Sequence, residues 1–208
     1  MRNATLFIVF LIVCLVLAAP AAARSANGPV RGTPITGCMV IDQPGTYILT
    51  RNLMNVAPGP SGACIVVNAD ATIDGRGHTL DGIGTDTAVK IPTMDLSDGA
   101  TVRNLVLTDW NTGVSVSSAF GVSISGCTFR NNRFGVSVAD GGADIQNCRI
   151  SGSDMGVLIE PLSGVGVSNS RIADNGIGVV IDDFASVVIT NNYFRNAENV
   201  LIRGDRPL

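Results

Sequence analysis

The sequence has few charged residues, few aromatic residues and only one lysine, Lys90. Of its 208 residues, 15% are charged and 5% are aromatic, and the formal net charge is −3. Disordered proteins combine low hydrophobicity with high net charge, so a chain with 46% hydrophobic residues is expected to fold. Proteins that bind nucleic acid carry a basic patch, so we expect no nucleic-acid partner.

The chain also has a single histidine, His78. A metal site made of two histidines therefore cannot form within one chain. A lone histidine lacks the partner that activates a nucleophile, and glycine and aspartate residues surround His78. We interpret His78 as a turn residue, and we identify no set of residues that converges on catalysis.

The first residues have the composition of a secretion signal. Arg2 precedes an apolar run from Leu6 to Ala19, which Pro20 and three alanines follow. This order predicts a signal peptide over residues 1–23. The alternative is a retained anchor, although the run is short for a span of about 20 residues. No later stretch is long enough to cross a membrane, so we expect a secreted protein, outside the cell or in the envelope or periplasm.

The rest of the chain repeats a motif of about 22 residues. A Gly-Val dipeptide recurs at intervals of 21 or 22 residues, and its copies begin at Gly113, Gly135, Gly156 and Gly178. A second apolar column keeps the same register and contains Val102, Ile124, Ile145, Val167 and Ile189. A third contains Leu107, Phe129, Ile150, Ile172 and Phe194. Three columns in one register indicate a repeat protein.

Each repeat contains short strands. Val114 and Val116 are apolar and the serine between them is polar, an alternation typical of strands. The frame of leucine-rich repeats is missing. We therefore predict an all-β fold, a parallel β-helix (solenoid) of about six coils over residues 46–208 that follows a lead-in segment at 24–45. One interior ladder is then expected to contain Val116, Val138, Ile159, Ile181 and Ile202.

Three segments near the start of the repeat region resemble the opening of NosD-like right-handed parallel β-helix proteins with a CASH-type domain. They begin Ile41-Asp-Gln-Pro-Gly-Thr-Tyr, Cys64-Ile-Val-Val and Ile73-Asp-Gly-Arg-Gly-His-Thr-Leu-Asp-Gly. The resemblance implies a right-handed coil and a secreted or periplasmic protein. It does not imply one activity, because this fold hosts lyases, hydrolases, adhesins and other surface proteins.

The four cysteines after the predicted signal peptide suggest disulfides in an oxidising compartment. Cys127 and Cys148 occupy the same column in adjacent coils, where stacking near 4.8 Å permits a disulfide. Two reduced thiols stacked in the core are the alternative, and the sequence leaves both open. Cys38 and Cys64 would by exclusion tie the lead-in segment to the first coils.

Four carboxylates are the candidates for a metal site. Glu160 and Asp182 fall in one column of the repeat, and Asp140 and Asp183 fall in the next. Stacked carboxylates could hold Ca²⁺, which takes 6–8 oxygen ligands. The alternative, which we favour, is an acidic strip exposed to solvent without any cofactor.

Two other columns carry polar residues. Arg149 and Arg171 share a column, but nothing in the sequence places them beside the acids, as a polysaccharide lyase requires. The last corner of each repeat carries an asparagine or glycine, which we interpret as a structural ladder rather than a binding site: Asn104, Gly126, Asn147, Asn169 and Asn191.

The favoured functional hypothesis is a secreted, non-catalytic β-helix protein of the cell surface or envelope that binds glycans or surface proteins. The first alternative is a carbohydrate-active enzyme, a polysaccharide lyase or glycoside hydrolase, with a groove along one sheet. The second is a NosD-type copper-processing accessory, which one histidine and scattered methionines do not support. No capping helix is predicted after Ile202, so we also expect self-association through the C-terminal coil.

Overall fold

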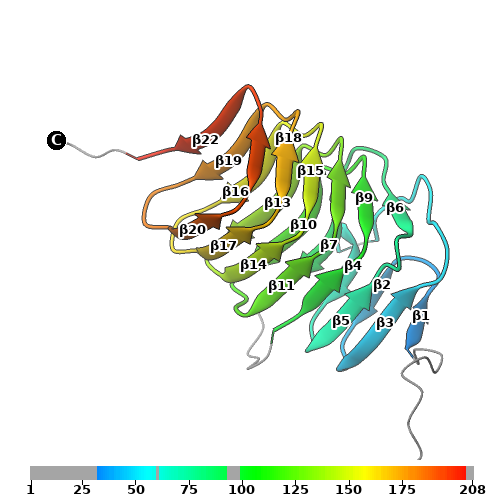
Figure 1. The fold of residues 1–208 in the computed structure, drawn as a ribbon. Coiled ribbons are helices and arrows are strands. Elements are labelled where there is room, and N and C mark those ends of the chain that lie inside the picture. Colours follow the sequence, from blue (N-terminus) through cyan, green and yellow to red (C-terminus); the bar gives the residue numbers. More distant parts are fainter. Residues whose placement is uncertain (1–31, 60, 93–98, 205–208) are drawn as a thin grey trace, which may run out of the picture. The chain divides into compact units, whose positions relative to one another are not determined.

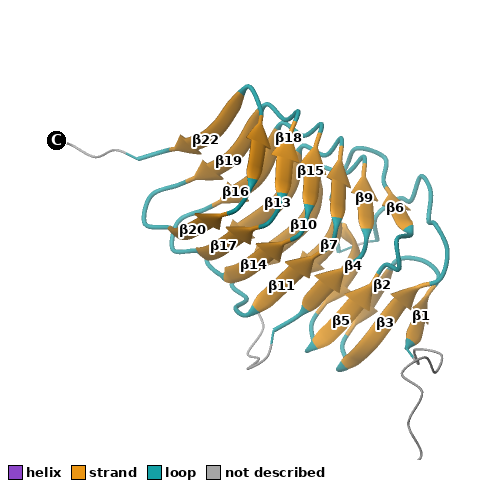
Figure 2. Ribbon diagram, in the orientation of Figure 1, coloured by secondary structure: helices purple, strands orange, loops and turns teal. Residues whose placement is uncertain are grey.

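The computed structural model describes residues 32–59, 61–92 and 99–204. The predicted signal peptide, residues 1–23, lies outside the described residues. The described part contains 22 strands and no helix, so no helix there is long and apolar enough to cross a membrane. All strands belong to three parallel sheets, which we call sheets A, B and C (Figures 1 and 2). The all-β prediction is confirmed.

Each sheet contains one strand from each successive coil. Sheet A has the order β1 (Thr33–Ile35), β3 (Gly45–Leu49), β5 (Ala71–Asp74), β8 (Thr101–Arg103), β11 (Val122–Ser125), β14 (Gly142–Gln146), β17 (Gly164–Ser168) and β20 (Ser186–Thr190). Sheet B has the order β2 (Met39–Ile41), β4 (Ala63–Val67), β7 (Thr87–Ile91), β10 (Thr112–Ser117), β13 (Phe134–Ala139), β16 (Met155–Ile159), β19 (Ile177–Ile181) and β22 (Glu198–Ile202). Sheet C has the order β6 (Thr79–Asp81), β9 (Val106–Thr108), β12 (Thr128–Arg130), β15 (Arg149–Ser151), β18 (Arg171–Ala173) and β21 (Tyr193–Arg195).

The strand order shows a solenoid. A strand of one sheet is followed in the chain by strands of the other sheets, and the next strand of its own sheet pairs with it in parallel one coil later. The result is a β-helix of about seven turns with about 22 residues per turn. The predicted parallel β-helix is therefore confirmed, with one turn more than the six expected.

The additional turn comes from the segment 24–45, which the sequence predicts as a lead-in. β1 and β2 lie in this segment and pair in parallel with β3 and β4, so the sheets begin before residue 46. Both strands have three residues, and each buries one side chain, Ile35 or Ile41. An alternation this short is not recognisable in the sequence.

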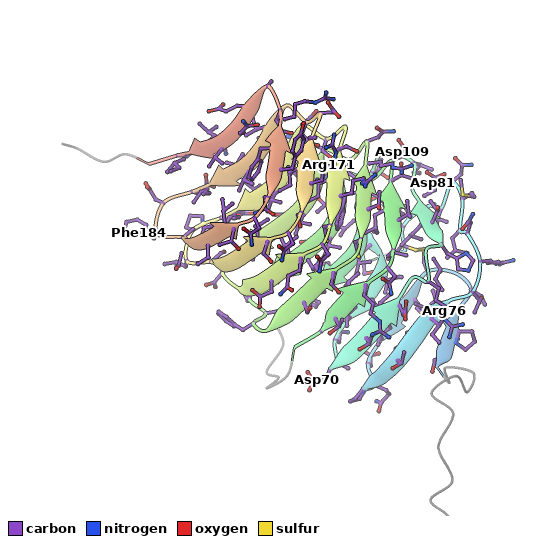
Figure 3. All side chains as sticks on the ribbon, viewed as in Figure 1. Asp70, Arg76, Asp81, Asp109, Arg171 and Phe184 are labelled. Carbon is purple, nitrogen blue, oxygen red and sulfur yellow. A yellow bond between two sulfur atoms is a disulfide. The ribbon has the colours of Figure 1, made fainter. Side chains whose placement is uncertain are left out.

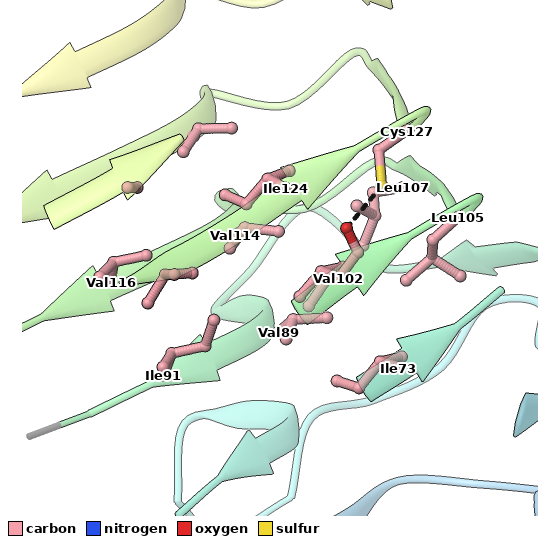
Figure 4. Close-up of a cluster of buried hydrophobic side chains, with 14 of the residues drawn as sticks. Ile73, Val89, Ile91, Val102, Leu105, Leu107, Val114, Val116, Ile124 and Cys127 are labelled. Carbon is pink, nitrogen blue, oxygen red and sulfur yellow. Dashed lines mark hydrogen bonds between the residues drawn. The ribbon is translucent and has the colours of Figure 1, made fainter. Parts of the chain in front are cut away.

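The core lies inside the coils, and alternation within each strand fills it. Val114 and Val116 on β10 are 0% exposed, whereas Ser115 between them is partly exposed. Figure 4 shows these valines packed against Ile124 and Leu107 from the other two sheets. The strand register confirms the predicted interior ladder, which contains Val116, Val138, Ile159, Ile181 and Ile202. Burial of this ladder is the main source of stability, because a single coil cannot bury its apolar face alone.

The repeated glycine in sheet B has a steric cause. A Cβ atom on Gly135 would lie 2.5 Å from the carbonyl oxygen of Gly156 in the next coil and 2.8 Å from the Ile150 side chain. Gly113 and Gly156 have the same close contact with the following coil. A side chain at this position would push neighbouring coils apart, so the glycine column is a requirement of stacking.

The last described coil is the most exposed part of the solenoid. Ile202, which continues the interior ladder, is 71% exposed, and Val200 beside it is 38% exposed. β20, β21 and β22 each end the order of their sheet. The self-association that the sequence predicts at this coil stays a prediction.

We expect an interior residue and its outward neighbour on the same strand to differ sharply in their effect on stability. Ile124 on β11 is fully buried, and Ser123 before it is partly exposed. Ile124→Ala should lower the free energy of unfolding by about 2–5 kcal/mol, because it removes buried methyl groups and leaves a cavity. Ser123→Ala, the matched control, should change it by no more than about 0.5 kcal/mol. Urea unfolding followed by circular dichroism measures both, and equal effects would contradict the assigned register.

Candidate functional site

The predicted calcium ligands lie at the ends of sheet B strands. Glu160 follows β16 and Asp182 follows β19, and their backbone amides pair with the preceding coil, as the predicted column requires. The next member of the column is a cation. The Arg203 guanidinium lies 3.8 Å from the Asp182 carboxylate. Glu160 accepts a hydrogen bond of 3.2 Å from the Ser137 hydroxyl.

The second pair of carboxylates does not complete a metal site. The Asp140 carboxylate accepts a hydrogen bond of 3.4 Å from the Ser118 hydroxyl. Asp183 lies near Gly204, on the other side of the corner from Glu160. Within residues 32–59, 61–92 and 99–204, no group of three or more His, Cys, Asp or Glu side chains is arranged to hold a metal ion. The structure therefore does not bring Glu160, Asp182, Asp183 and Asp140 together as calcium ligands.

The cysteines have two different states. Cys38 and Cys64 form a disulfide, with a Cα–Cα distance of 4.4 Å, so the pairing predicted by exclusion is confirmed. It joins the first coil to the second beside β2 and β4. Cys127 and Cys148 are buried free thiols, which is the second of the two alternatives that the sequence leaves open.

His78 lies at the turn before β6. Its Nδ1 atom is 3.2 Å from the Asn52 side-chain oxygen, which also accepts a hydrogen bond from the backbone amide of Thr79. These contacts hold the turn between two coils. The interpretation of His78 as a turn residue agrees with this geometry.

A buried carboxylate lies on sheet A. Asp74 accepts hydrogen bonds from the backbone amide of Arg76 at 3.1 Å, from the Asn104 amide at 3.2 Å and from the Arg103 guanidinium at 3.0–3.1 Å. Burial alone would raise the pKa of Asp74, but these donors outweigh it, and the pKa lies below its ordinary value. With every donor committed to coil stacking, this cluster is structural.

The arginines gather on the outer face of sheet C. Parallel in-register stacking places equivalent residues of successive coils in one line. The first outward column of this sheet contains Thr79, Val106, Thr128, Arg149, Arg171 and Tyr193. The second contains Asp81, Thr108, Arg130, Ser151, Ala173 and Arg195. We call the exposed residues Arg130, Arg149, Arg171, Arg195 and Tyr193 the arginine face.

Contacts within the arginine face order some of its side chains. The Arg171 guanidinium lies 4.4 Å from the centre of the Tyr193 ring, in a cation–π contact. Arg195 forms an ion pair of 2.6 Å with Asp174. No ion pair is printed for Arg130, Arg149 or Arg171 among the described residues, so these three charges face solvent. Figure 3 shows Arg171 among the side chains that cover sheet C.

A hollow of about 360 Å³ lies beside these arginines. Arg130, Arg149 and Arg171 line it together with the amides of Asn147 and Asn169. Its remaining lining residues are Gly126, Cys127, Thr128 and Cys148. The hollow combines guanidinium groups, which grip carboxylate or sulfate oxygens in pairs, with amides that can bond to hydroxyl groups.

The asparagine column at the edge of this hollow has two roles. Asn104, Gly126, Asn147, Asn169 and Asn191 all have positive φ, between 50° and 61°, so the column forms the corners, as predicted from the tolerance of asparagine for this conformation. Asn147 and Asn169 are also exposed and line the hollow. The sequence identified the corner but missed this accessible role. Gly126 carries no amide, and its position is open toward the hollow.

A second hollow, of about 410 Å³, lies on the outer face of sheet A. Gly164 and Gly166 of β17 form its floor, and Asp144 and Thr190 lie on either side. Asp144 is the single carboxylate among its lining residues. Glycoside hydrolases use a pair of carboxylates, so the geometry of this hollow gives no support to hydrolysis.

Comparison with known proteins agrees with the architecture. A family model described as "right handed beta helix region" matches residues 90–204. No curated protein and no solved structure gives a significant match to the chain. The match covers five coils, including every strand of the arginine face.

The shifted pKa of Asp74 predicts a pH dependence of stability. A depressed pKa stabilises the fold at pH values above the unfolded-state pKa, near 4 for aspartate. That contribution is lost as the pH falls through the lower pKa of the folded state. Asp74→Asn should therefore lower the free energy of unfolding by about 1–3 kcal/mol at pH 7, and the difference from the unmodified protein should shrink below pH 4. Urea unfolding from pH 7 to pH 2.5 measures this.

The exposed Asp144 provides a matched control, because it also belongs to sheet A. Asp144→Asn removes the same charge and should change the free energy of unfolding at pH 7 by no more than about 0.5 kcal/mol. A difference between Asp74→Asn and the unmodified protein that stays constant down to pH 2.5 would show that the carboxylate charge plays no part.

Proposed function

The chain belongs to the right-handed beta helix family, and on that basis we propose that it is a cell-surface or envelope protein that binds acidic glycans on the arginine face. The observation that carries this proposal is the line of exposed arginines beside a hollow lined by amides. The fold agrees in general with a surface or carbohydrate-related role. The proposal adds a place on the molecule and a class of ligand.

Charge distribution favours an anionic ligand. The whole chain has a net charge of −3, yet sheet C presents Arg130, Arg149, Arg171 and Arg195 on one face. An excess of cations against the sign of the whole molecule attracts and orients anions. The hollow itself has no carboxylate among its lining residues, so a bound anion meets no like charge there.

The spacing of the coils favours a polymer over a small anion. Equivalent residues on adjacent coils are about 4.8 Å apart, and Arg149 and Arg171 are such a pair. A chain that carries a carboxylate or sulfate on successive units can contact several coils at once. Linked contacts of this kind raise the overall affinity without requiring any single strong contact.

Tyr193 supplies an apolar surface at one end of the face. Its ring is 49% exposed and supports the Arg171 guanidinium from below. Sugar rings have apolar faces that pack on aromatic rings, and binding sites commonly combine such a ring with a few polar groups. This combination favours an acidic glycan over inorganic anions, which need charge alone.

The proposal predicts that loss of two neighbouring arginines weakens binding to acidic glycans. The Arg149→Gln/Arg171→Gln variant should bind an oligogalacturonate or a sulfated oligosaccharide at least about tenfold more weakly, because each guanidinium can form charge-assisted hydrogen bonds. Isothermal titration calorimetry at two salt concentrations measures this, and the affinity of the unmodified protein should fall as salt rises.

Two control variants separate charge from geometry. Lys90→Gln removes a cation from sheet B and should leave the affinity unchanged. Arg149→Lys/Arg171→Lys keeps both charges but loses paired hydrogen bonding, and its affinity should be intermediate. Equal binding of a neutral glycan would contradict the proposal. Release of shortened products from the polysaccharide would instead favour a carbohydrate-active enzyme.

A further inference from the structure

A second cysteine pair lies in the middle of the solenoid, at the base of the hollow. Cys127 and Cys148 directly precede β12 and β15, whose first residues, Thr128 and Arg149, are register partners. The two cysteines are therefore stacked one coil apart. They are 1% and 2% exposed and belong to the hydrophobic core.

The two thiols have the same orientation. The Cys127 sulfur lies 3.4 Å from the carbonyl oxygen of Ser125 and 3.6 Å from that of Val102, as Figure 4 shows for Val102. The Cys148 sulfur lies 3.3 Å from the carbonyl oxygen of Gln146 and 3.6 Å from that of Ile124. In each case one carbonyl is two residues earlier and the other belongs to the preceding coil.

The same interior column continues with residues that satisfy these contacts better. Ser170, one coil after Cys148, donates a hydrogen bond of 2.9 Å to the carbonyl two residues before it. Asn192, one coil further, donates one of 2.7 Å to the carbonyl of Val167 in the preceding coil. A thiol is a weaker donor than a hydroxyl or an amide. Hydrogen bonding therefore does not explain cysteine at two successive positions, whereas disulfide formation requires it.

The other cysteine pair shows that this stacking permits a disulfide. Cys38 and Cys64 directly precede the register partners Met39 and Ile65, so they are stacked one coil apart like Cys127 and Cys148. They are joined, with a Cα–Cα distance of 4.4 Å. Disulfides span Cα–Cα distances of about 4.4–6.8 Å, and adjacent parallel strands are about 4.8 Å apart.

We propose that Cys127 and Cys148 are an oxidation site that closes to a second disulfide inside the solenoid and joins two central coils covalently. The oxidant is a small disulfide such as oxidised glutathione. One protein thiolate attacks a sulfur of that disulfide, a mixed disulfide forms and one glutathione leaves. The second protein thiolate then attacks the protein sulfur of the mixed disulfide and releases the second glutathione. Two electrons and two protons pass from the protein thiols to the two glutathione molecules.

The local chemistry supports Cys148 as the first nucleophile. A hydrogen bond from the Cys127 thiol lowers the pKa of Cys148, against the opposing effect of burial. The same hydrogen bond and burial both raise the pKa of Cys127. Because both sulfurs face the core, the exchange takes place while the coils assemble rather than in the closed solenoid. This inference does not depend on the binding of glycans.

Refolding tests the proposal. The denatured and fully reduced chain, without residues 1–23 so that Cys14 is absent, is refolded in a buffer of reduced and oxidised glutathione. Free thiols are then alkylated in denaturant and counted by mass spectrometry. We expect no free thiol and a cross-linked peptide pair that contains Cys127 and Cys148. Two alkylated thiols at these positions, with the Cys38–Cys64 disulfide closed, would overturn the proposal, as would a cross-link between the two pairs.

Serine variants provide the controls. Ser170 shows that serine fits this column, so Cys127→Ser and Cys148→Ser should fold, and each should retain one thiol or one attached glutathione. The oxidised protein should unfold roughly 5–10 °C higher than the Cys127→Ser/Cys148→Ser variant, because the cross-link restricts the unfolded chain. An unfolding midpoint equal to that of the double variant would show that no stabilising cross-link forms.

Discussion

The structure depends on the in-register hydrogen bonding of each coil to the next. Three parallel sheets run through the whole repeat, and every strand pairs with the equivalent strand about 22 residues later. Because this register is constant, a side chain has the same direction in every coil. The interior ladder through Val116 and Val138, the arginine face and both stacked cysteine pairs all follow from that one constraint.

The corners limit what this stacking can tolerate, because the chain there leaves the sheets. Buried asparagines bond to backbone groups that would otherwise lack partners. Asn132 accepts a hydrogen bond from the amide of Trp110 and donates one to the carbonyl of Leu107. Asn175 fills the same role two coils later, between Ser153 and Ile150. Unpaired polar groups in a core are costly, so these amides are as necessary to the fold as the valine ladder.

The sequence was sufficient to predict the fold wherever the repeat is regular. Alternation at Val114 and Val116 and the recurring glycines determine strands and coil length, and the structure agrees. The first coil was missed because β1 and β2 each bury a single side chain. Only part of the arginine face was predicted. Arg149 and Arg171 share an obvious column, whereas Arg130 and Arg195 lie two positions later, and their common face depends on the short strands of sheet C.

The corner residue Gly135 has a consequence for how such a protein can evolve. Its missing side chain lets one coil approach the next at a fixed separation, so a duplicated unit of about 22 residues can be inserted between two coils without altering the others. Each duplication would lengthen every face by one position. Ligand length and the number of contacts could then change in whole steps, through gene duplication rather than through the redesign of a pocket.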